Sequence, residues 1–358
     1  MPNIKILICY HKPSPIIANE VLQPMLLGAC HADKASRETL ENACRAQGVE
    51  LWCDDGSHKV RGGGGVTSQP QTLKTPQTPL DSKTSLETTR LESTSAESAK
   101  SPTTLAPSFE SSEISEFNPY FCELTAMYWA WKNLKCDYYG LFHYRRLLDF
   151  TQKAPYNEDK KLANIRADNP NIAQLFDITQ EKLASILSRC DMLASGDPIK
   201  NNEEDSKTLT LYESYAKAHH KTDLDIALKI MREKYPHYEE AIQKAIFSTG
   251  QRTSWGNVLV MKKELFFEYC EFLFSILFEA CKHIDAKSYD PYQARVFGFL
   301  AERLMNVFMI HHELHSHTKI QTYRLAKLKN PQPWFGWVHD GNVIKFYFFK
   351  IRLIRRQG

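Results

Sequence analysis

Three side chains that can bind a phosphate stand close together in the middle of the chain. They are His143, Arg145 and Arg146. They follow a short, mostly apolar and aromatic run, residues 137–142, which is typical of a strand inside a sheet. Ligands of open α/β sheets bind beyond the carboxyl ends of the strands, and arginine forks suit phosphate. Because strand residues alternate between faces, only one arginine needs to face the ligand, and the other can pack on an aromatic ring or pair with a nearby aspartate.

Glu302 is a charged side chain in an otherwise apolar stretch. The spacing of the apolar residues around it predicts a helix over 298–310. A carboxylate in such a place is costly unless it is paired or used, so Glu302 is our first candidate for a general base that takes a proton from a hydroxyl. A structural ion pair with Arg295 or Arg303 is the alternative that the sequence leaves open. Asp290 is the second candidate for the base.

The elements that must position these side chains follow from capping residues and apolar spacing. Asn118 is a suitable N-cap and Pro119 fits the first turn, after which apolar residues recur at helical spacing as far as Trp131. Short apolar runs predict further strands, and other segments show helical spacing or loop composition. The further strands are 4–9, 191–194 and 257–261, the further helices are 35–47, 179–190, 208–217, 223–234 and 263–283, and a loop covers 150–176.

Length and composition limit the classes of protein to consider. A chain of 358 residues can bury a substantial core, as one large domain or two. The formal net charge of +3 gives no overall signature of polyanion binding. The nine cysteines form no CxxC pair, which favours reduced thiols over disulfides or zinc. No GxGxxG follows the first predicted strand, which disfavours a nucleotide-binding dehydrogenase.

Two stretches differ in composition from the rest of the chain. Residues 57–112 contain four consecutive glycines and many Ser, Thr, Pro, Gln and Lys, so we expect a disordered insert. Residues 331–358 form a tail of aromatic, apolar and basic residues that suits an anionic membrane surface, chiefly through 341–358. A final strand or helix packed on the domain is the alternative. Because no apolar run is long enough for a signal peptide or a membrane span, we expect a cytoplasmic protein, peripheral at most on the inner membrane.

Several motifs, taken in order, resemble those of one protein family. They are Tyr10-His11-Lys12, Pro24 with Gly28, Asp54-Asp55, CELTAMYWAWKN at 122–133, DYYGLFHYRR at 137–146 and YDPYQARVFGFLAERL at 289–304. The family is known mainly as a domain of unknown function, DUF4422, and holds bacterial capsule and lipopolysaccharide glycosyltransferases placed with the GT-A enzymes. The resemblance implies an α/β domain over 1–330 with a GT-A-like (Rossmann-like), mostly parallel central sheet flanked by helices.

The resemblance also implies an activity and partners. We expect a glycosyltransferase that moves a hexose from a nucleotide sugar, with UDP-hexose as the donor, to a glycan or lipid-linked acceptor in surface polysaccharide synthesis. A non-catalytic nucleotide-sugar or glycan-binding module of an envelope assembly complex is the alternative. We expect no nucleic-acid partner.

On the donor side, the loop after the first strand would contact the base or the phosphates. Gly28, in the stretch 22–28 that resembles the family's next loop, would let backbone approach the ligand. Glu123 is either a buried structural acceptor or a contact of the donor sugar, and Trp129 either stacks on the ligand or packs in the core. The predicted donor-side residues are Tyr10, His11, Lys12, Gly28, Asp54, Asp55, Asn118, Glu123 and Trp129.

GT-A enzymes usually hold the diphosphate through a metal ion bound by Asp-x-Asp at the end of a central strand. This sequence has His143-Tyr144-Arg145-Arg146 there, so we expect the arginines, with His143 nearby, to do the work of the metal without a required cofactor. A divalent metal, Mn²⁺ or Mg²⁺, is the alternative, with Asp54 and Asp55 as candidate ligands.

On the acceptor side, the Gly-Asn that leads into the strand at 257–261 resembles the acceptor-side strand of GT-A enzymes. We place His219-His220 on the surface or in an acceptor-side loop. The predicted acceptor-side residues are Asn257, Asp290 and Arg295.

Overall fold

The structure is a computed structural model that describes residues 1–57, 107–153, 165–196, 209–250 and 253–329, and the backbone of three strands within 335–357. The predicted disorder of the insert concerns residues 58–106, which lie outside this description, as do most side chains of the tail. The last part of the predicted insert belongs to the fold instead. The Tyr128 hydroxyl lies 3.1 Å from the carbonyl oxygens of both Ser108 and Ser111.

The main sheet has eight strands and is mixed. Its order is β3-β2-β1-β4-β5-β8-β6-β7, and β4 also pairs with β7, so β4, β5, β8, β6 and β7 close into a ring. The strands around β1 are parallel, whereas β4 is antiparallel to both β5 and β7. The prediction of a mostly parallel sheet is therefore only partly correct. The strands are β1 (Ile4–Tyr10), β2 (Leu22–Leu26), β3 (Trp52–Cys53), β4 (Tyr138–His143), β5 (Arg146–Lys153), β6 (Met192–Ser195), β7 (Leu259–Lys262) and β8 (Ile320–Lys327).

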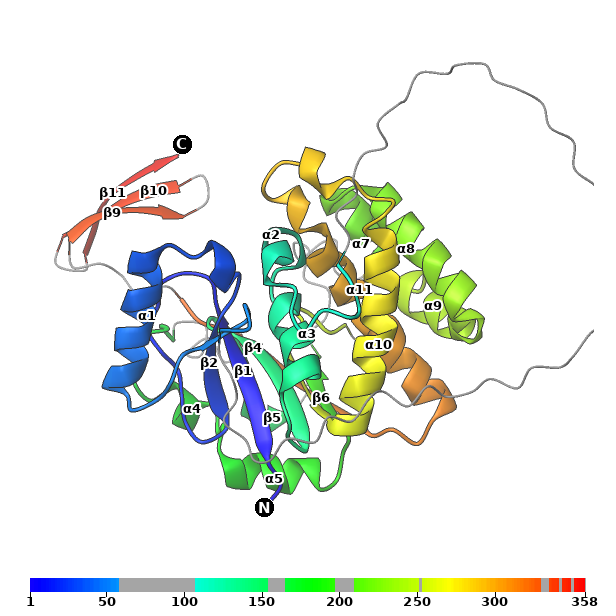
Figure 1. Cartoon of the computed structure of the whole chain (residues 1–358), viewed down its shortest axis with the longest axis horizontal. Helices are drawn as coiled ribbons and strands as arrows, with labels where there is room; N and C mark the ends of the chain where they lie inside the picture. The colour runs from blue at the N-terminus through cyan, green and yellow to red at the C-terminus, as the bar shows by residue number, and fades with distance from the viewer. Residues whose placement is uncertain are drawn as a thin grey trace, which may run out of the picture.

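Helices cover both faces of this sheet (Figure 1). The smaller layer holds α1, α4 and α5, and the larger layer holds α3 and α7 to α11. The helices are α1 (Lys34–Ala46), α2 (Asn118–Phe121), α3 (Leu124–Asn133), α4 (Ile172–Leu175), α5 (Gln180–Leu187), α7 (Leu211–Ala218), α8 (Lys221–Lys234), α9 (Glu239–Ile246), α10 (Lys263–Ala280) and α11 (Val296–His315).

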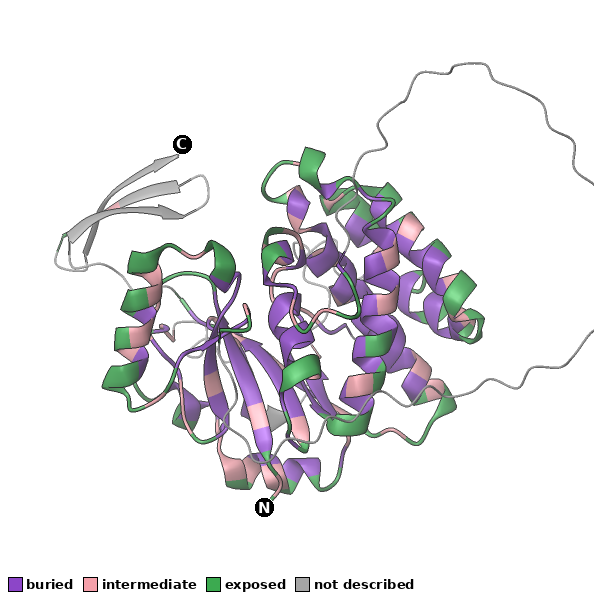
Figure 2. Cartoon of the chain, in the orientation of Figure 1, coloured by how far each residue is buried: buried purple, intermediate pink, exposed green. Residues whose placement is uncertain are grey.

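Strand β1 shows why the sheet lies between two cores. Its side chains alternate, so that Ile6 and Ile8 face the layer of α1 and α5 while Leu7 and Cys9 face the layer of α3 and α10. All four are fully buried. The continuous apolar pattern that predicted a buried strand is therefore confirmed, and Figure 2 shows the same burial along the centre of the sheet.

Three local predictions are wrong. Residues 22–28 include β2, which the proline in the run concealed, and the predicted loop at 150–176 begins inside β5. The single helix predicted from Asn118 is two helices, because Cys122 has a positive φ of 52° between α2 and α3. The Asn118 side chain caps no N-terminus. Its Nδ2 donates to the Cys122 carbonyl at 2.8 Å and so supports the break between the helices.

The tail forms a separate three-stranded antiparallel sheet, in the order β11-β10-β9. Its strands are β9 (Phe335–Asp340), β10 (Val343–Phe348) and β11 (Ile351–Gln357). Contact with a membrane surface through 341–358 stays a prediction. Within the described part of the chain, no helix combines the length and the apolar character that crossing a bilayer requires.

A close approach between β1 and β4 gives a first test of the fold. Gly140 pairs with Ile6, and a Cβ atom at position 140 would lie 2.6 Å from the Ile6 Cγ1. We expect Gly140→Ala to lower the free energy of unfolding by about 1–3 kcal/mol, because the neighbouring strand has no room for a methyl group. Urea denaturation measures the loss. Ile6→Ala should reduce the effect of Gly140→Ala, and strictly additive losses would contradict this explanation.

Candidate active site

A tight hairpin positions the basic cluster. His143 at the end of β4 pairs with Arg146 at the start of β5, so only Tyr144 and Arg145 form the turn. The Arg145 guanidinium carbon lies 5.1 Å from the centre of the Tyr144 ring. Arg146 instead lines a cavity. The two arginines therefore face different surroundings, because Arg145 lies in the turn while Arg146 begins β5, and Arg145 packs on an aromatic ring.

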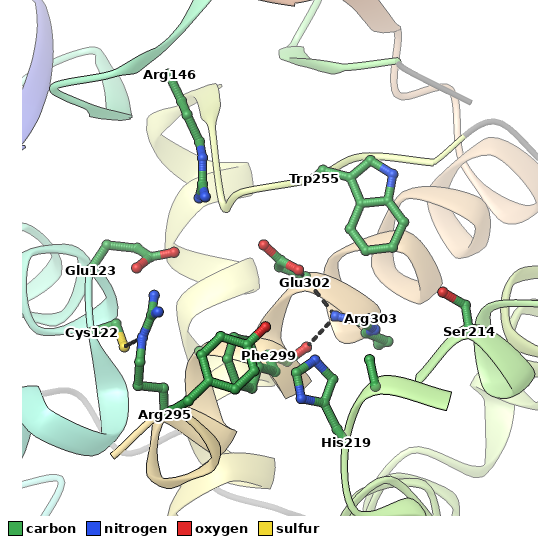
Figure 3. A pocket seen from close by; sticks show the side chains of 13 residues that line it. Cys122, Glu123, Arg146, Ser214, His219, Trp255, Arg295, Phe299, Glu302 and Arg303 are labelled. Carbon is green, nitrogen blue, oxygen red and sulfur yellow. Dashed lines mark hydrogen bonds and ion pairs between the residues drawn. The ribbon is translucent and has the colours of Figure 1, made fainter. Parts of the chain in front are cut away.

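The cavity has a volume of about 290 Å³ and lies between the hairpin, the α2–α3 break, the loop before β7 and the first turns of α11. Figure 3 shows how its charged side chains converge. Four of the predicted site residues line it, namely Arg146, Glu123, Arg295 and Glu302. The other lining residues are Cys122, Ser214, Ala218, His219, Trp255, Tyr292, Gly298, Phe299 and Arg303.

Glu123 stands at the break between α2 and α3. Its Oε1 accepts a hydrogen bond of 2.8 Å from the Nδ2 of Asn257, which is buried and also has a positive φ, 51°. In Figure 3 its carboxylate lies between Arg146 and Arg295. Asn257, predicted on the acceptor side, thus lies behind Glu123 and outside the residues that line the cavity.

Glu302 is held on both oxygens. Oε1 accepts from the Gly256 N–H at 2.9 Å, and Oε2 accepts from Arg303 Nη1 at 3.0 Å. Desolvation raises the pKa of Glu302, and the charge of Arg303 opposes that rise. The Arg303 guanidinium is itself buried between the rings of Tyr215 and Trp255, at 4.9 and 5.0 Å. Of the two ion pairs left open by the sequence, the structure has the one with Arg303.

Arg295 forms no direct ion pair with either of the two cavity carboxylates, Glu123 and Glu302. Its Nε donates to the Cys122 Sγ at 3.3 Å, and its guanidinium carbon lies 5.4 Å from the centre of the Phe299 ring. It belongs to a short 3₁₀ helix, Gln293–Arg295, at the start of α11. Asp290 precedes this turn and accepts from the N–H groups of Tyr292 and Gln293, so it stabilises the turn and does not line the cavity.

Asp54 has a structural position that we did not predict. It is fully buried, and its two oxygens accept hydrogen bonds from the N–H groups of Gly28 and Ala29 and from the hydroxyls of Ser115 and Thr125. The expectation that Asp54 contacts the donor or a metal is therefore wrong, because protein groups occupy both oxygens. Gly28 is also needed by the protein itself: its φ is +57°, and a Cβ there would lie 2.8 Å from Asn118 Oδ1.

Three other predicted donor-side residues pack within the protein. Trp129 is buried against Trp52, with ring centres 5.7 Å apart, so it belongs to the core. The buried Tyr10 hydroxyl accepts from the Ile17 N–H at 2.8 Å and so fixes the loop after β1. Asp55 contacts Arg37 at 3.5 Å and the Ser57 N–H at 3.0 Å.

His11, Lys12 and His143 remain near the ligand side of the sheet. His11 and Lys12 are exposed in the loop after β1. The His11 and His143 rings are centred 5.8 Å apart, and the Arg145 N–H donates to the Nδ1 of His143 at 3.2 Å. A neutral His143 ring thus accepts a hydrogen bond from the backbone of the hairpin. The positive charges of Arg145, Arg146 and Arg295 act on this ring.

The surroundings of His143 predict a pH dependence of stability. Desolvation, followed by the charges of Arg146 and its neighbours, lowers the pKa of His143 from 6.5 to about 2. Between these values the unfolded chain binds a proton that the folded protein does not, so stability is lost as the pH falls below about 6.5. We expect a contribution of up to about 2 kcal/mol between roughly pH 6.5 and 5. Urea denaturation should show a smaller loss in His143→Gln, and an equal loss would contradict this assignment.

The described residues contain no cluster of three metal-binding side chains, and the two predicted carboxylate ligands are already engaged by protein groups. Over the described ranges, no three His, Cys, Asp or Glu side chains are arranged so that they could hold a metal ion. Both oxygens of Asp54 are already used, and Asp55 lies beside Arg37. We therefore assign no step of the chemistry to a metal.

The aromatic part of the cavity was missed from the sequence. Trp255, Tyr292 and Phe299 line it, and His219 stacks on Phe299 with ring centres 4.0 Å apart. The assignment of His219 to an acceptor-side loop was the one signal that pointed here. Tyr292 and Phe299 lie seven residues apart, but Trp255 and His219 come from distant segments, so only the tertiary structure brings the four rings together.

Comparison with known proteins places the chain in a family. The model of a family described as a domain of unknown function, DUF4422, matches residues 91–313, which is more than half of the chain. The chain belongs to the DUF4422 family. The resemblance seen in the motifs is thereby confirmed. A comparison with curated proteins found no match.

The fold of this DUF4422 protein is similar to that of a solved structure, the apo form of WbbM, a bifunctional glycosyltransferase. The TM-score is 0.64 and the sequence identity is 23%, and the similarity covers 95% of this chain and 47% of WbbM. The chain thus spans about half the length of WbbM. At this level of identity the similarity concerns the fold, an α/β architecture with a mixed sheet.

Proposed function

We propose that this DUF4422 protein is a glycosyltransferase that moves a hexose from a nucleotide sugar, expected to be a UDP-hexose, to a glycan acceptor. One observation carries the proposal: Arg146 and Arg295 flank Glu123 in a single cavity at the carboxyl end of β4. Cations suit the departing diphosphate, and a carboxylate beside them suits the hydroxyl that replaces it. The fold shared with WbbM adds support.

The charges suggest where the diphosphate would bind. Arg146 faces the cavity, and His143 and the exposed Lys12 lie at the ends of neighbouring parallel strands. Ligands of such sheets bind outside the carboxyl ends of the strands. We therefore place the diphosphate against Arg146, where hydrogen-bond donors stabilise the charge that develops on the leaving group.

The aromatic side of the cavity suits a saccharide. Binding sites for organic ligands combine apolar and aromatic surface with a few polar groups, and Trp255, Tyr292 and Phe299 offer such surface in the cavity that Glu123 also lines. Tyr292 is 54% exposed, so a long or lipid-linked acceptor could enter beside it. We further propose that residues 341–358 bring the protein to an anionic cytoplasmic membrane surface, in surface polysaccharide synthesis. Flotation with phosphatidylglycerol vesicles, with and without the tail, tests this.

Thermal shift with a panel of nucleotide sugars tests the function. A donor at about 100 times its Kd adds about 2.7 kcal/mol of stability, which for a protein of this size raises Tm by roughly 5–10 °C. UDP and UDP-hexoses should protect, and GDP and CDP compounds serve as controls. Turnover should then survive excess EDTA. Complete loss that Mn²⁺ or Mg²⁺ restores would contradict the role of the arginines, and protection without turnover would favour a binding module.

A further inference from the structure

Two carboxylates face the cavity, and among the described residues only one of them, Glu123, has an oxygen that accepts no hydrogen bond. Both oxygens of Glu302 accept hydrogen bonds, from Gly256 and Arg303. Glu123 accepts one bond, from Asn257 to Oε1, and its Oε2 has no hydrogen-bond partner among the residues that the structure describes. A base must offer an oxygen to the hydroxyl that it deprotonates, and the oxygen must lie within hydrogen-bond reach. Glu123 meets this condition in the cavity as it stands.

The backbone around Glu123 is strained. In the described ranges three residues other than glycine have a positive φ, namely Cys122, Asn257 and Asp177. Cys122 directly precedes Glu123, and Asn257 donates a hydrogen bond to it. Each such conformation costs about 1–3 kcal/mol and persists only where the surrounding structure imposes it. Two of the three strained residues therefore serve the placement of one carboxylate.

The charges in the cavity divide the roles of the two acids further. Glu302 forms an ion pair with Arg303, which is 4% exposed, so its charge is neutralised within the protein. In Figure 3 Glu123 lies between Arg146 and Arg295. Glu123 forms no ion pair with either arginine within the described part of the chain. Its negative charge contributes to the raised pKa of Glu302, after desolvation, which indicates that the two carboxylates are close.

We infer that Glu123 is the general base of the transfer and that Asn257 positions it, while Glu302 and Arg303 form the wall behind the reacting groups. This inference rests on the proposed function. Glu123 Oε2 takes the proton of the acceptor hydroxyl while the acceptor oxygen bonds to the anomeric carbon. The bond from that carbon to the diphosphate oxygen breaks, and the nucleoside diphosphate leaves with the electron pair. A base that activates the incoming hydroxyl in one displacement inverts the anomeric configuration.

The test compares Glu123→Gln with Glu302→Gln, with Glu313→Gln on the exposed end of α11 as the matched control. The readout is UDP release from UDP-α-D-galactose and UDP-α-D-glucose with water as the acceptor. We expect Glu123→Gln to lower kcat about 10²- to 10⁴-fold while UDP still raises Tm as in the wild type. The fold-decrease in kcat of Glu302→Gln should be less than a tenth of the fold-decrease in Glu123→Gln. Glu313→Gln should have the kcat of the wild type.

Three results would overturn the inference. The first is that the kcat of Glu123→Gln stays within about threefold of the wild type. The second is that Glu123→Gln raises only the KM for the donor, which is the effect expected of a residue that contacts the donor without acting as a base. The third is a released sugar that first appears as the α-anomer in NMR spectra. Asn257→Ala should lower kcat and leave KM for the donor unchanged. If the wild type releases UDP from neither sugar nucleotide and UDP does not protect it, the proposed function fails together with the inference.

Discussion

We expect Asp54→Asn to lower the free energy of unfolding by about 3 kcal/mol, because an amide cannot accept all four hydrogen bonds that this carboxylate accepts. Each oxygen of Asp54 accepts one backbone N–H and one hydroxyl, over distances from 2.6 to 3.0 Å. Hydrogen bonds to a charged group contribute about 1.5–3 kcal/mol each, and an amide nitrogen would oppose two donors, one of them a backbone N–H that cannot turn away. For a protein of this size the loss lowers Tm by roughly 6–12 °C.

The adjacent Asp55 is the control for this prediction. It is more exposed than Asp54 and contacts Arg37 at 3.5 Å. Asp55→Asn should cost less than about 1 kcal/mol, as exposed ion pairs do. Equal losses of Tm in the two variants would contradict the assignment of Asp54 as a structural residue. Asp54→Asn should also weaken turnover, since Thr125 joins Asp54 to the helix that follows Glu123.

The strands could be predicted where burial left a continuous apolar pattern. Residues 4–9, 137–142, 191–194 and 257–261 correspond to β1, β4, β6 and β7, to within a residue or two at their ends. The closure of the sheet could not be predicted, because β4 pairs with β7, a strand more than a hundred residues later. Pairing between distant strands has no local signal in the sequence. The resemblance to the family implied a mostly parallel sheet, so we did not predict the antiparallel strands.

The site shows a similar division between local and tertiary information. Arg146, Arg295 and Glu302 were predicted by type and context, and they do line one cavity. The pair Asp54-Asp55 looks like a ligand site in the sequence, yet the four donors around Asp54 come from three distant segments. The sequence did not decide whether Glu123 is a structural acceptor or a contact of the donor sugar. The direction of its side chain depends on the break between helices at Cys122, and the apolar spacing gave no sign of that break.

Arg146→Met should lower the rate of UDP release about 10²- to 10³-fold, the usual cost of removing one donor to developing charge in a water-excluded site. Its side chain lies along the backbone of Gly256, where a Cβ would come within 3.4 Å of Arg146 Cδ, so the guanidinium is held toward the cavity. A methionine keeps most of the apolar stem and removes the charge and the donors. UDP should also protect the variant less against thermal unfolding.

Arg145→Met separates this role from a general effect of positive charge. Arg145 is the neighbour of Arg146 in the chain, but its guanidinium lies over the Tyr144 ring and not on the cavity wall. We expect Arg145→Met to lower the rate of UDP release less than about tenfold, because it only weakens the positive electrostatic potential in the cavity. The rate of Arg146→Lys should fall between those of the two methionine variants, because lysine keeps the charge but lacks the paired donors of the guanidinium. A larger loss in Arg145→Met than in Arg146→Met would move the diphosphate from the cavity to the outer face of the hairpin. The arrangement in which Arg146 and Arg295 flank Glu123 would then no longer describe the reaction.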